Sequence, residues 1–219
     1  MADLFSDELR TSLRKAAVIA VLVIDNSDDA VPTVKALLRG GVNAIELTLR
    51  TEGALDALEK IRNEAPEILA GVGTILNEDQ VRAVKARGAP FGVSPGLNPK
   101  VVEAAASAGL PFAPGILTPS ELETAYEKGC RVLKLFPSES SGGLTYLKDI
   151  NAPYAHLGIK YIPLGGVSTS NLRQYLEEPE ILAVGGSWLA PRKLIQSRDW
   201  DGISRNCEEA RGIALKARP

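Results

Sequence analysis

Short apolar runs recur along the chain, and polar stretches with helical periodicity separate them. In chain order the runs read AVIAVLVI, AIELTL, ILAGVGT, FGVSPG, PFAPGI, VLKLF, YIPLGG and ILAVGGS. They start roughly 20 to 30 residues apart, which leaves room for one helix between consecutive runs. Eight strands alternating with helices predict an α/β fold, a (β/α)8 TIM barrel that occupies residues 1–219 as a single domain. An additional helix over about Ser6 to Lys15 precedes the first run, so residues 1–15 are expected to form an N-terminal helical extension.

Polar residues mark where several of the expected helices begin. Asn77, Asn98 and Thr118 each stand at a helix start as an N-cap, and Thr118 opens the capping box TPSE. A last helix is predicted from near Asp199. Its apolar residues at helical spacing are Ile203, Cys207, Ala210 and Ala214.

The second apolar run, extended to AIELTLR, alternates strictly between two faces. Its apolar members are Ile45, Leu47 and Leu49, and its polar members are Glu46, Thr48 and Arg50. In a barrel the apolar set packs against the helices, while the polar set points inward and toward the carboxyl ends of the strands, where active sites are built. A strand at a solvated sheet edge shows the same alternation, so the pattern alone leaves both interpretations open.

The stretch VLKLFPSE places one lysine, Lys134, in the middle of an apolar run. Such a lysine either keeps its ammonium in water at the strand end, or lies buried where the neutral, nucleophilic amine is favoured. Val132, Lys134 and Phe136 share one face of the predicted strand. We expect the apolar flank of Leu133, Leu135 and Phe136 to exclude water from the amine.

Four polar groups can converge at one mouth of the predicted barrel. Thr74 ends the third run as Arg50 ends the second, so both can join Glu46 and Lys134 there. A neutral lysine amine attacks a ketone to form an iminium, which draws electrons out of an adjacent carbon–carbon bond. Glu46 can move protons, and Arg50 with Thr74 can hold a carboxylate. This set of groups predicts a 2-keto acid substrate.

Two glycine pairs follow the last two predicted strands, in LGGVSTSN (164–171) and VGGSW (184–188). Turns of this kind expose backbone amides, and with a helix N-terminus behind them they bind phosphate. In α/β barrels the loops after the seventh and eighth strands are the frequent location. Simple tight turns remain the alternative interpretation.

Charge and composition narrow the possible partners. The formal net charge is −2 and the pI is near 5.6, without a basic patch interleaved with aromatic residues, so nucleic-acid binding is not expected. The acidic, polar start MADLFSDELR differs from a secretory signal, and the apolar run from Ala16 to Ile24 is too short to span a bilayer. We therefore expect a cytoplasmic protein without a membrane partner.

The residues that usually bind metals are few. Cys130 and Cys207 are the two cysteines and lie far apart, and His156 is the single histidine. A disulfide framework, a metal site and a cofactor are therefore not expected, and His156 is expected to be structural or solvated.

Taken together, the motifs resemble one known family. The chain is similar to the 2-keto-3-deoxy-6-phosphogluconate (KDPG) / 4-hydroxy-2-oxoglutarate (KHG) aldolases, class I enzymes whose KDPG members serve the Entner–Doudoroff pathway. The stretches that carry this resemblance are AVPTVKALLRGGVNAIELTLRT, GVGTILN, VSPGL, LKLFPSE, GGVSTSN and GGSW. The resemblance implies a homotrimer and a small-molecule phosphosugar substrate that is cleaved without a metal or cofactor.

The resemblance also implies a role for individual residues. Lys134 would be the Schiff-base lysine and Glu46 the proton shuttle. Pyruvate-carboxylate contacts would come from Arg50 and Thr74, and Pro95 and Phe136 would line the pocket. The phosphate would be held by Gly165, Gly166, Gly186 and Ser187.

Three positions depart from the family pattern, and one of them is Val72 in GVGT, where we expect a minor packing change. Leu164 stands where the family commonly has a threonine beside the substrate C4 oxygen, which leaves KHG and the galactonate-derived epimer of KDPG as alternative substrates. Ser138 stands where alanine is usual, and we expect a minor packing change there. From other protein classes, a phosphosugar isomerase or epimerase and a non-catalytic phosphate-binding barrel remain alternatives, but neither needs an iminium-forming lysine.

Overall fold

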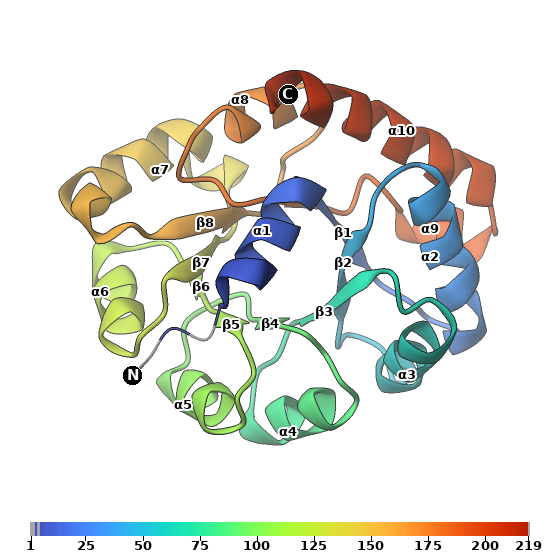
Figure 1. Cartoon of the computed structure of the whole chain (residues 1–219), viewed down its shortest axis with the longest axis horizontal. Helices are drawn as coiled ribbons and strands as arrows, with labels where there is room; N and C mark the ends of the chain where they lie inside the picture. The colour runs from blue at the N-terminus through green and yellow to red at the C-terminus, as the bar shows by residue number, and fades with distance from the viewer. Residues whose placement is uncertain (1–2, 4, 219) are drawn as a thin grey trace.

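The computed structural model describes residues 3 and 5–218 and shows parallel strands surrounded by helices (Figure 1). Up to the middle of the chain the elements are α1 (Asp7–Ala16), β1 (Val18–Leu22), the 3-10 helix η1 (Ser27–Asp29), α2 (Ala30–Arg39), β2 (Ala44–Thr48), α3 (Ala54–Glu64), β3 (Leu69–Gly73), α4 (Glu78–Ala86), β4 (Gly92–Val93) and α5 (Pro99–Ser107). The remaining elements are β5 (Phe112–Ala113), β6 (Gly115–Ile116), α6 (Pro119–Glu127), β7 (Val132–Leu135), η2 (Glu139–Ser141), α7 (Gly143–Asn151), η3 (Ala152–Leu157), β8 (Lys160–Pro163), α8 (Leu172–Leu176), β9 (Val184–Gly186), α9 (Arg192–Gln196) and α10 (Trp200–Ala217).

Each of the eight predicted runs contains a strand, and the predicted first and last helices are present as α1 and α10. Positions 1, 2, 4 and 219 of the expected domain lie outside the described residues. None of the helices described here is both long and apolar enough to cross a membrane.

The strands form two parallel sheets, where the sequence predicts one closed eight-stranded barrel. One sheet has the order β5-β4-β3-β2-β1-β9 and the other the order β6-β7-β8. On one side, isolated parallel bridges join the sheets, Tyr161 with Ile181 and Leu164 with Gly185. The α/β class with parallel strands is thus confirmed, while the strand ladder is not continuous.

The fifth predicted run accounts for the break on the other side. It forms two short strands, β5 and β6, separated by Pro114 alone. A proline has no backbone N–H to donate to a ladder. The Pro114 carbonyl still accepts a hydrogen bond of 2.9 Å from the Lys134 amide, so the chain passes from one sheet to the other at this residue.

The helix starts follow the predicted local chemistry. The side chains of Asn77 and Asn98 accept hydrogen bonds from the amides of Gln80 and Lys100. Thr118 forms the full capping box with Glu121. In α10 the predicted apolar residues are all buried, namely Ile203, Cys207, Ala210 and Ala214.

Alternate strand residues face two different apolar clusters. Ile45, Leu47, Leu133 and Leu135 pack outward with the surrounding helices. The inner cluster combines inward strand residues with three side chains from the N-terminal segment, Phe5, Leu13 and Ala16. The predicted assignment of the two faces of β2 is therefore confirmed.

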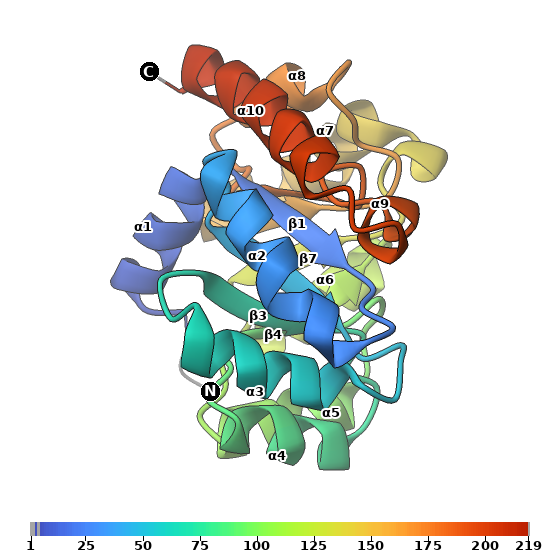
Figure 2. The ribbon, with the colours of Figure 1, turned by 90° about the vertical axis from the view of Figure 1, so that its right-hand side faces the viewer.

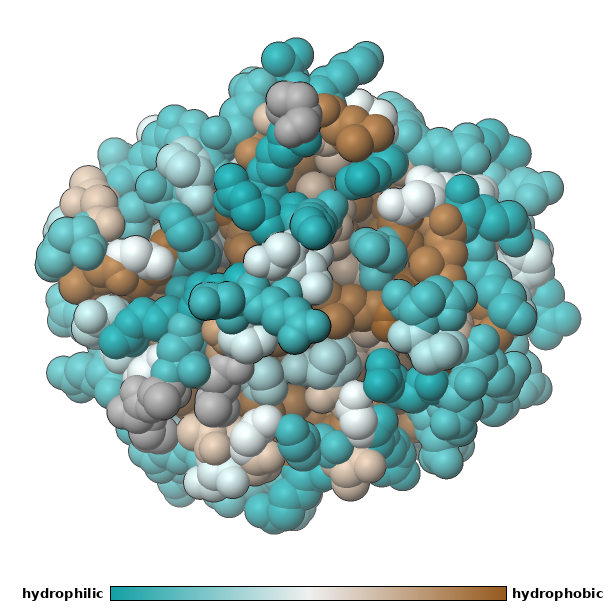
Figure 3. All heavy atoms as spheres, in the orientation of Figure 1, coloured by the Kyte–Doolittle hydropathy of each residue, from teal (hydrophilic) through white to brown (hydrophobic). Residues whose placement is uncertain are grey.

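Helix α1 covers the amino-terminal end of the strands. Figure 2 shows α1 on the side from which β1 runs, away from the arrowhead of β1. Its buried residues Leu13 and Ala16 face the strands, and charged residues lie at both of its ends. Hydrophilic atoms therefore dominate the centre of this face in Figure 3, where Figure 1 places α1. The carboxyl ends of the strands open on the opposite side.

Candidate active site

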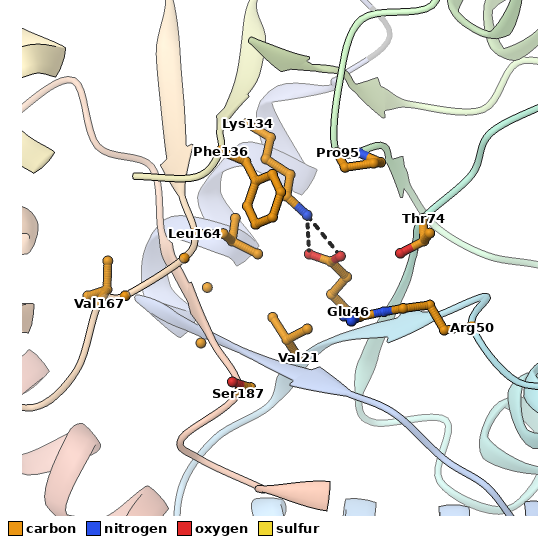
Figure 4. Close-up of a pocket in the computed structure, with 14 residues that line it drawn as sticks. Val21, Glu46, Arg50, Thr74, Pro95, Lys134, Phe136, Leu164, Val167 and Ser187 are labelled. Carbon is orange, nitrogen blue, oxygen red and sulfur yellow. Dashed lines mark hydrogen bonds and ion pairs between the residues drawn. The ribbon is translucent and has the colours of Figure 1, made fainter. Parts of the chain in front are cut away.

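Lys134 and Glu46 form a buried pair between β7 and β2. The Lys134 Nζ lies 3.0 Å from Oε1 and 3.2 Å from Oε2 of Glu46, and it donates to both (Figure 4). Lys134 is 4% exposed and Glu46 is 3% exposed. The structure thus brings together two residues that are 88 positions apart in the chain.

The backbone of the neighbouring strand makes room for the carboxylate. Gly73 of β3 lies opposite Thr48 of β2, and a Cβ atom at position 73 would overlap the Glu46 side chain. A glycine is therefore required beside Glu46, because any larger residue would displace the carboxylate from Lys134.

The pair can produce a neutral amine without leaving a charge unpaired. Removing one partner of a buried ion pair is costly because the other charge then stays uncompensated. Transfer of one proton from the Lys134 ammonium to the Glu46 carboxylate cancels both charges at once. The direct hydrogen bonds provide the path for this transfer.

The apolar surroundings of Lys134 differ from those expected. Leu133 and Leu135 belong to the outer cluster, because neighbouring strand residues point to opposite faces, so the prediction that they shield the amine is wrong. Phe136 was the third residue expected to do so, and its ring centroid lies 5.3 Å from the Lys134 Nζ. Val21 and Leu164 line the same pocket from β1 and from the segment after β8.

Arg50, Thr74 and Pro95 follow β2, β3 and β4 and lie on one side of the pair (Figure 4). Arg50 is exposed, so it can meet an anion that enters from solvent. Thr74 has a φ of 60°, a left-handed conformation that is strained for a β-branched residue. Strain of this kind concentrates at functional sites, where the surrounding structure holds it.

The glycine pairs line the same pocket, and Ser187, which follows the second pair, lies across it from these residues (Figure 4). Gly165 and Gly166 have φ values of 94° and 88°, which only glycine adopts without strain. Gly186 ends β9 and Ser187 follows it. Helices α8 and α9 each have five residues and begin several positions later, so the predicted helix N-termini do not lie directly behind the glycines. Backbone amides of the lining glycines and the Ser187 hydroxyl, rather than a helix dipole, are the groups available to an anion here.

All residues predicted for the site line one cavity of about 280 Å³. They are Glu46, Arg50, Thr74, Pro95, Lys134, Phe136, Leu164, Gly165, Gly166, Gly186 and Ser187.

Three further residues, which were not predicted from the sequence, also line the cavity: Val21, Val167 and Gly185. Val167 and Gly185 belong to the two glycine motifs, so a signal for them was present. Val21 lies opposite Glu46 in the sheet. Its run contains no polar residue, so no alternation of polar and apolar positions shows which of its residues point inward.

The remaining candidate residues lie outside the pocket. His156 is exposed on η3, in agreement with a solvated histidine. Cys130 and Cys207 are buried and free, and burial raises the pKa of their thiols to about 11 and about 12. Among residues 3 and 5–218, no three His, Cys, Asp or Glu side chains are grouped as metal ligands.

Comparison with known proteins gives consistent matches over nearly the whole chain. The family model of the KDPG and KHG aldolases matches residues 9–206. The 2-dehydro-3-deoxy-phosphogluconate aldolase of Haemophilus influenzae is 40% identical over 204 residues, which are 93% of this chain and 95% of that protein. The KHG/KDPG aldolase of Escherichia coli K12 is 40% identical over 198 residues, which are 90% of this chain and 92% of that protein.

A solved structure also matches this chain over most of its length. It is a KDPG aldolase from Legionella pneumophila, with pyruvate captured at low pH as a covalent carbinolamine intermediate. Its TM-score is 0.87 at 35% sequence identity, and the match covers 92% of this chain and 97% of that chain.

Proposed function

The chain belongs to the KDPG and KHG aldolase family, and from this premise we propose that it cleaves KDPG to pyruvate and glyceraldehyde 3-phosphate through a Schiff base on Lys134. It is a class I aldolase, an enzyme that breaks a carbon–carbon bond. The observation that carries the assignment of residues is the buried Lys134–Glu46 pair on the wall of the cavity. A covalent carbinolamine of pyruvate in the Legionella pneumophila enzyme supports the same route here.

The first half of the reaction forms the iminium. Glu46 accepts a proton from Lys134, and the neutral amine attacks the C2 ketone of the substrate to give a carbinolamine. The carbinolamine hydroxyl then leaves as water after it receives a proton, a step that we assign to Glu46 because its carboxylate lies beside the Lys134 amine.

The second half breaks the bond between C3 and C4. A base removes the proton from the C4 hydroxyl, the C4 aldehyde forms, and the bonding electrons move through C3 into the iminium to give an enamine. Glu46 is the carboxylate in contact with Lys134 and is assigned as the proton shuttle. Protonation of the enamine at C3 and addition of water to the iminium release pyruvate and restore Lys134.

The two ends of the substrate have different partners. We assign the carboxylate to Arg50 and Thr74 on one side of the pair, and the phosphate to Gly165, Gly166, Gly186 and Ser187 on the other. Pro95 and Phe136 line the space between these ends.

A second substrate is favoured by one specific side chain. Leu164 is buried in the cavity wall and carries no hydroxyl to contact the C4 oxygen. A site without a donor at this position gains little from one configuration at C4 over the other. We therefore propose that the galactonate-derived epimer is also cleaved.

Borohydride trapping tests the assignment of Lys134. With pyruvate and borohydride, we expect loss of activity and a reduced pyruvate adduct on the peptide that contains Lys134, because borohydride reduces the iminium to a stable amine. Lys160, which lies on the neighbouring strand and donates to the Pro179 carbonyl, serves as an internal control and should stay unlabelled. A label on another lysine would contradict the assignment. If activity were lost in a chelator and restored by a divalent ion, the metal-independent mechanism would be wrong.

Three further properties remain proposals. We propose that the two sheets act as one (β/α)8 barrel, supported by the single residue Pro114 between β5 and β6 and by the bridges from Tyr161 and Leu164. The family resemblance supports a homotrimer, which sedimentation analysis can test. The cytoplasmic location stays a prediction from the sequence.

A further inference from the structure

A network of three side chains lies behind the Gly165–Gly166 turn and outside the cavity lining. The hydroxyls of Ser138 and Tyr175 are 2.8 Å apart, and the Tyr175 hydroxyl also donates to Glu139 Oε1. Ser138 is 0% exposed and Tyr175 is 1% exposed. The minor packing change expected at Ser138 is therefore a buried hydrogen bond.

The direction of the hydrogen bonds follows from the number of donors. A tyrosine hydroxyl has one hydrogen, and an ionised carboxylate can only accept. Since Tyr175 donates to Glu139, Ser138 must donate to the Tyr175 oxygen. Burial, together with the hydrogen bond to Glu139, raises the pKa of Tyr175, so its hydroxyl remains a donor at neutral pH.

The same segment forms the back of the glycine turn. The Ser138 amide donates to the Leu164 carbonyl at 2.7 Å, and the Glu139 amide donates to the Gly165 carbonyl at 2.9 Å. A Cβ atom on Gly166 would lie 2.5 Å from the Glu139 Cβ, so the Glu139 side chain fills the space beside that glycine. Peptide planes fixed in this way keep their amides in a constant direction.

Tyr175 connects this segment to the chain that follows the turn. It lies on α8, which begins at Leu172 after the loop of residues 167–171. Its hydrogen bond holds the Glu139 carboxylate beside Gly143, where a Cβ atom would lie 2.8 Å from Oε1. Without that bond the carboxylate is free to rotate next to the groups assigned to the phosphate, and a like charge there repels an anion.

We propose that Ser138, Tyr175 and Glu139 are positioning residues that orient the Gly165 and Gly166 amides toward the substrate phosphate. The proposal rests on the phosphate site assigned under the proposed function. None of the three residues is among those that line the cavity. Their effect reaches it through the two hydrogen bonds to the turn and through the packing of Glu139 on Gly166.

The variant Tyr175→Phe tests the proposal, with Tyr161→Phe as a matched control. Tyr161 is also buried, and its hydroxyl donates a 2.8 Å hydrogen bond to Asn151 at the end of α7, rather than to the segment behind the turn. KM and kcat are measured for KDPG and for its unphosphorylated analogue, at a temperature where both variants are folded. We expect Tyr175→Phe to raise KM for KDPG about 2- to 13-fold, the range of one lost hydrogen bond, and to leave the kinetics of the analogue unchanged. Tyr161→Phe should lower the thermal unfolding temperature and leave the ratio between the two substrates as in the wild type.

Two variants of Glu139 show whether its hydrogen bond with Tyr175 is needed to orient the turn, or whether only the packing of its side chain matters. Glu139→Gln keeps an oxygen that accepts from Tyr175 and should retain the wild-type KM for KDPG, whereas Glu139→Ala should raise it. The proposal is wrong if Tyr175→Phe affects both substrates equally, or if it keeps the wild-type preference for phosphate. A wild-type enzyme without any preference for phosphate would instead refute the phosphate site itself, and the positioning network with it.

Discussion

At the amino-terminal end of the strands, the inward positions hold apolar side chains under α1, whereas at the carboxyl-terminal end they surround a cavity with a buried ion pair. The same strands supply both regions, because an inward residue of the first region is followed two positions later in the chain by a residue of the second. The inner cluster contains Ile19, Ala44, Val93, Val132 and Ile162. The cavity is lined by the residues two positions later, Val21, Glu46, Pro95, Lys134 and Leu164.

This step of two residues explains how one chain combines packing with chemistry. Successive inward side chains of a strand lie on the same face, so a single strand can place a packing residue below and a reactive residue above. The apolar layer excludes water from one side of the Lys134–Glu46 pair. We therefore expect changes in the cavity to affect catalysis and changes under α1 to affect stability.

The largest effect should come from the cavity. In Glu46→Gln the amide cannot accept the proton from Lys134, so we expect kcat to fall by about 10²- to 10⁴-fold while KM changes little. Steady-state kinetics measure both constants, and thermal unfolding shows whether the variant is folded. If turnover stays near that of the wild type, Glu46 is not the proton shuttle and another base must be sought.

Leu13→Ala should produce the opposite result. Leu13 is fully buried where α1 meets the strands, and its truncation should lower the free energy of unfolding by about 2 to 5 kcal/mol. Urea unfolding measures this loss. We expect kcat/KM to be unchanged at a temperature where the protein is folded.

Leu9→Ala is the matched control, because Leu9 lies on the same helix and is only partly buried against the same cluster. Its loss of stability should be smaller. A loss of activity in Leu13→Ala without a loss of stability would show that the two ends of the strands are coupled.

Leu164 belongs to both regions, and its substitution should have the smallest effect. It is part of the inner cluster and also lines the cavity, where it fills the space that Gly185 leaves open. Leu164→Thr adds a hydroxyl near the assigned C4 position. A neutral hydrogen bond contributes roughly 0.5 to 1.5 kcal/mol, so the preference between the two C4 epimers should sharpen about 2- to 13-fold.

The control for this variant is Leu164→Val, which has nearly the shape of the threonine variant and no hydroxyl. The measurement is the ratio of kcat/KM for the two epimers in all three proteins. If wild type already prefers one epimer by several hundredfold, and neither substitution changes the ratio, another residue recognises C4.

Features carried by neighbouring residues could be predicted from the sequence. The alternation in AIELTLR gave the inward face of β2, and the caps at Asn77, Asn98 and Thr118 gave three helix starts. These signals are local, because the face of a strand residue and the cap of a helix depend only on residues a few positions away in the chain.

Features that depend on the register between strands could not be predicted. The direct contact of Lys134 with Glu46 joins β7 of one sheet to β2 of the other, and the position of Gly73 beside the carboxylate arises from the pairing of β2 with β3. The same limit applies to Leu133 and Leu135, which adjoin Lys134 in the sequence but point to the opposite face of β7 and do not shield its amine. At Pro114 the missing N–H is visible in the sequence, but the passage of the chain from one sheet to the other at this single residue is not.

Gly73 has a consequence for efforts to evolve this enzyme. Every other amino acid brings a Cβ atom into the space of the Glu46 carboxylate. In a saturation library selected for activity, position 73 would therefore be as intolerant as Lys134, although it has no side chain and takes part in no chemical step. A residue-by-residue fitness map read without the structure would assign it a catalytic role, and a search for new activities would do better to leave this position fixed.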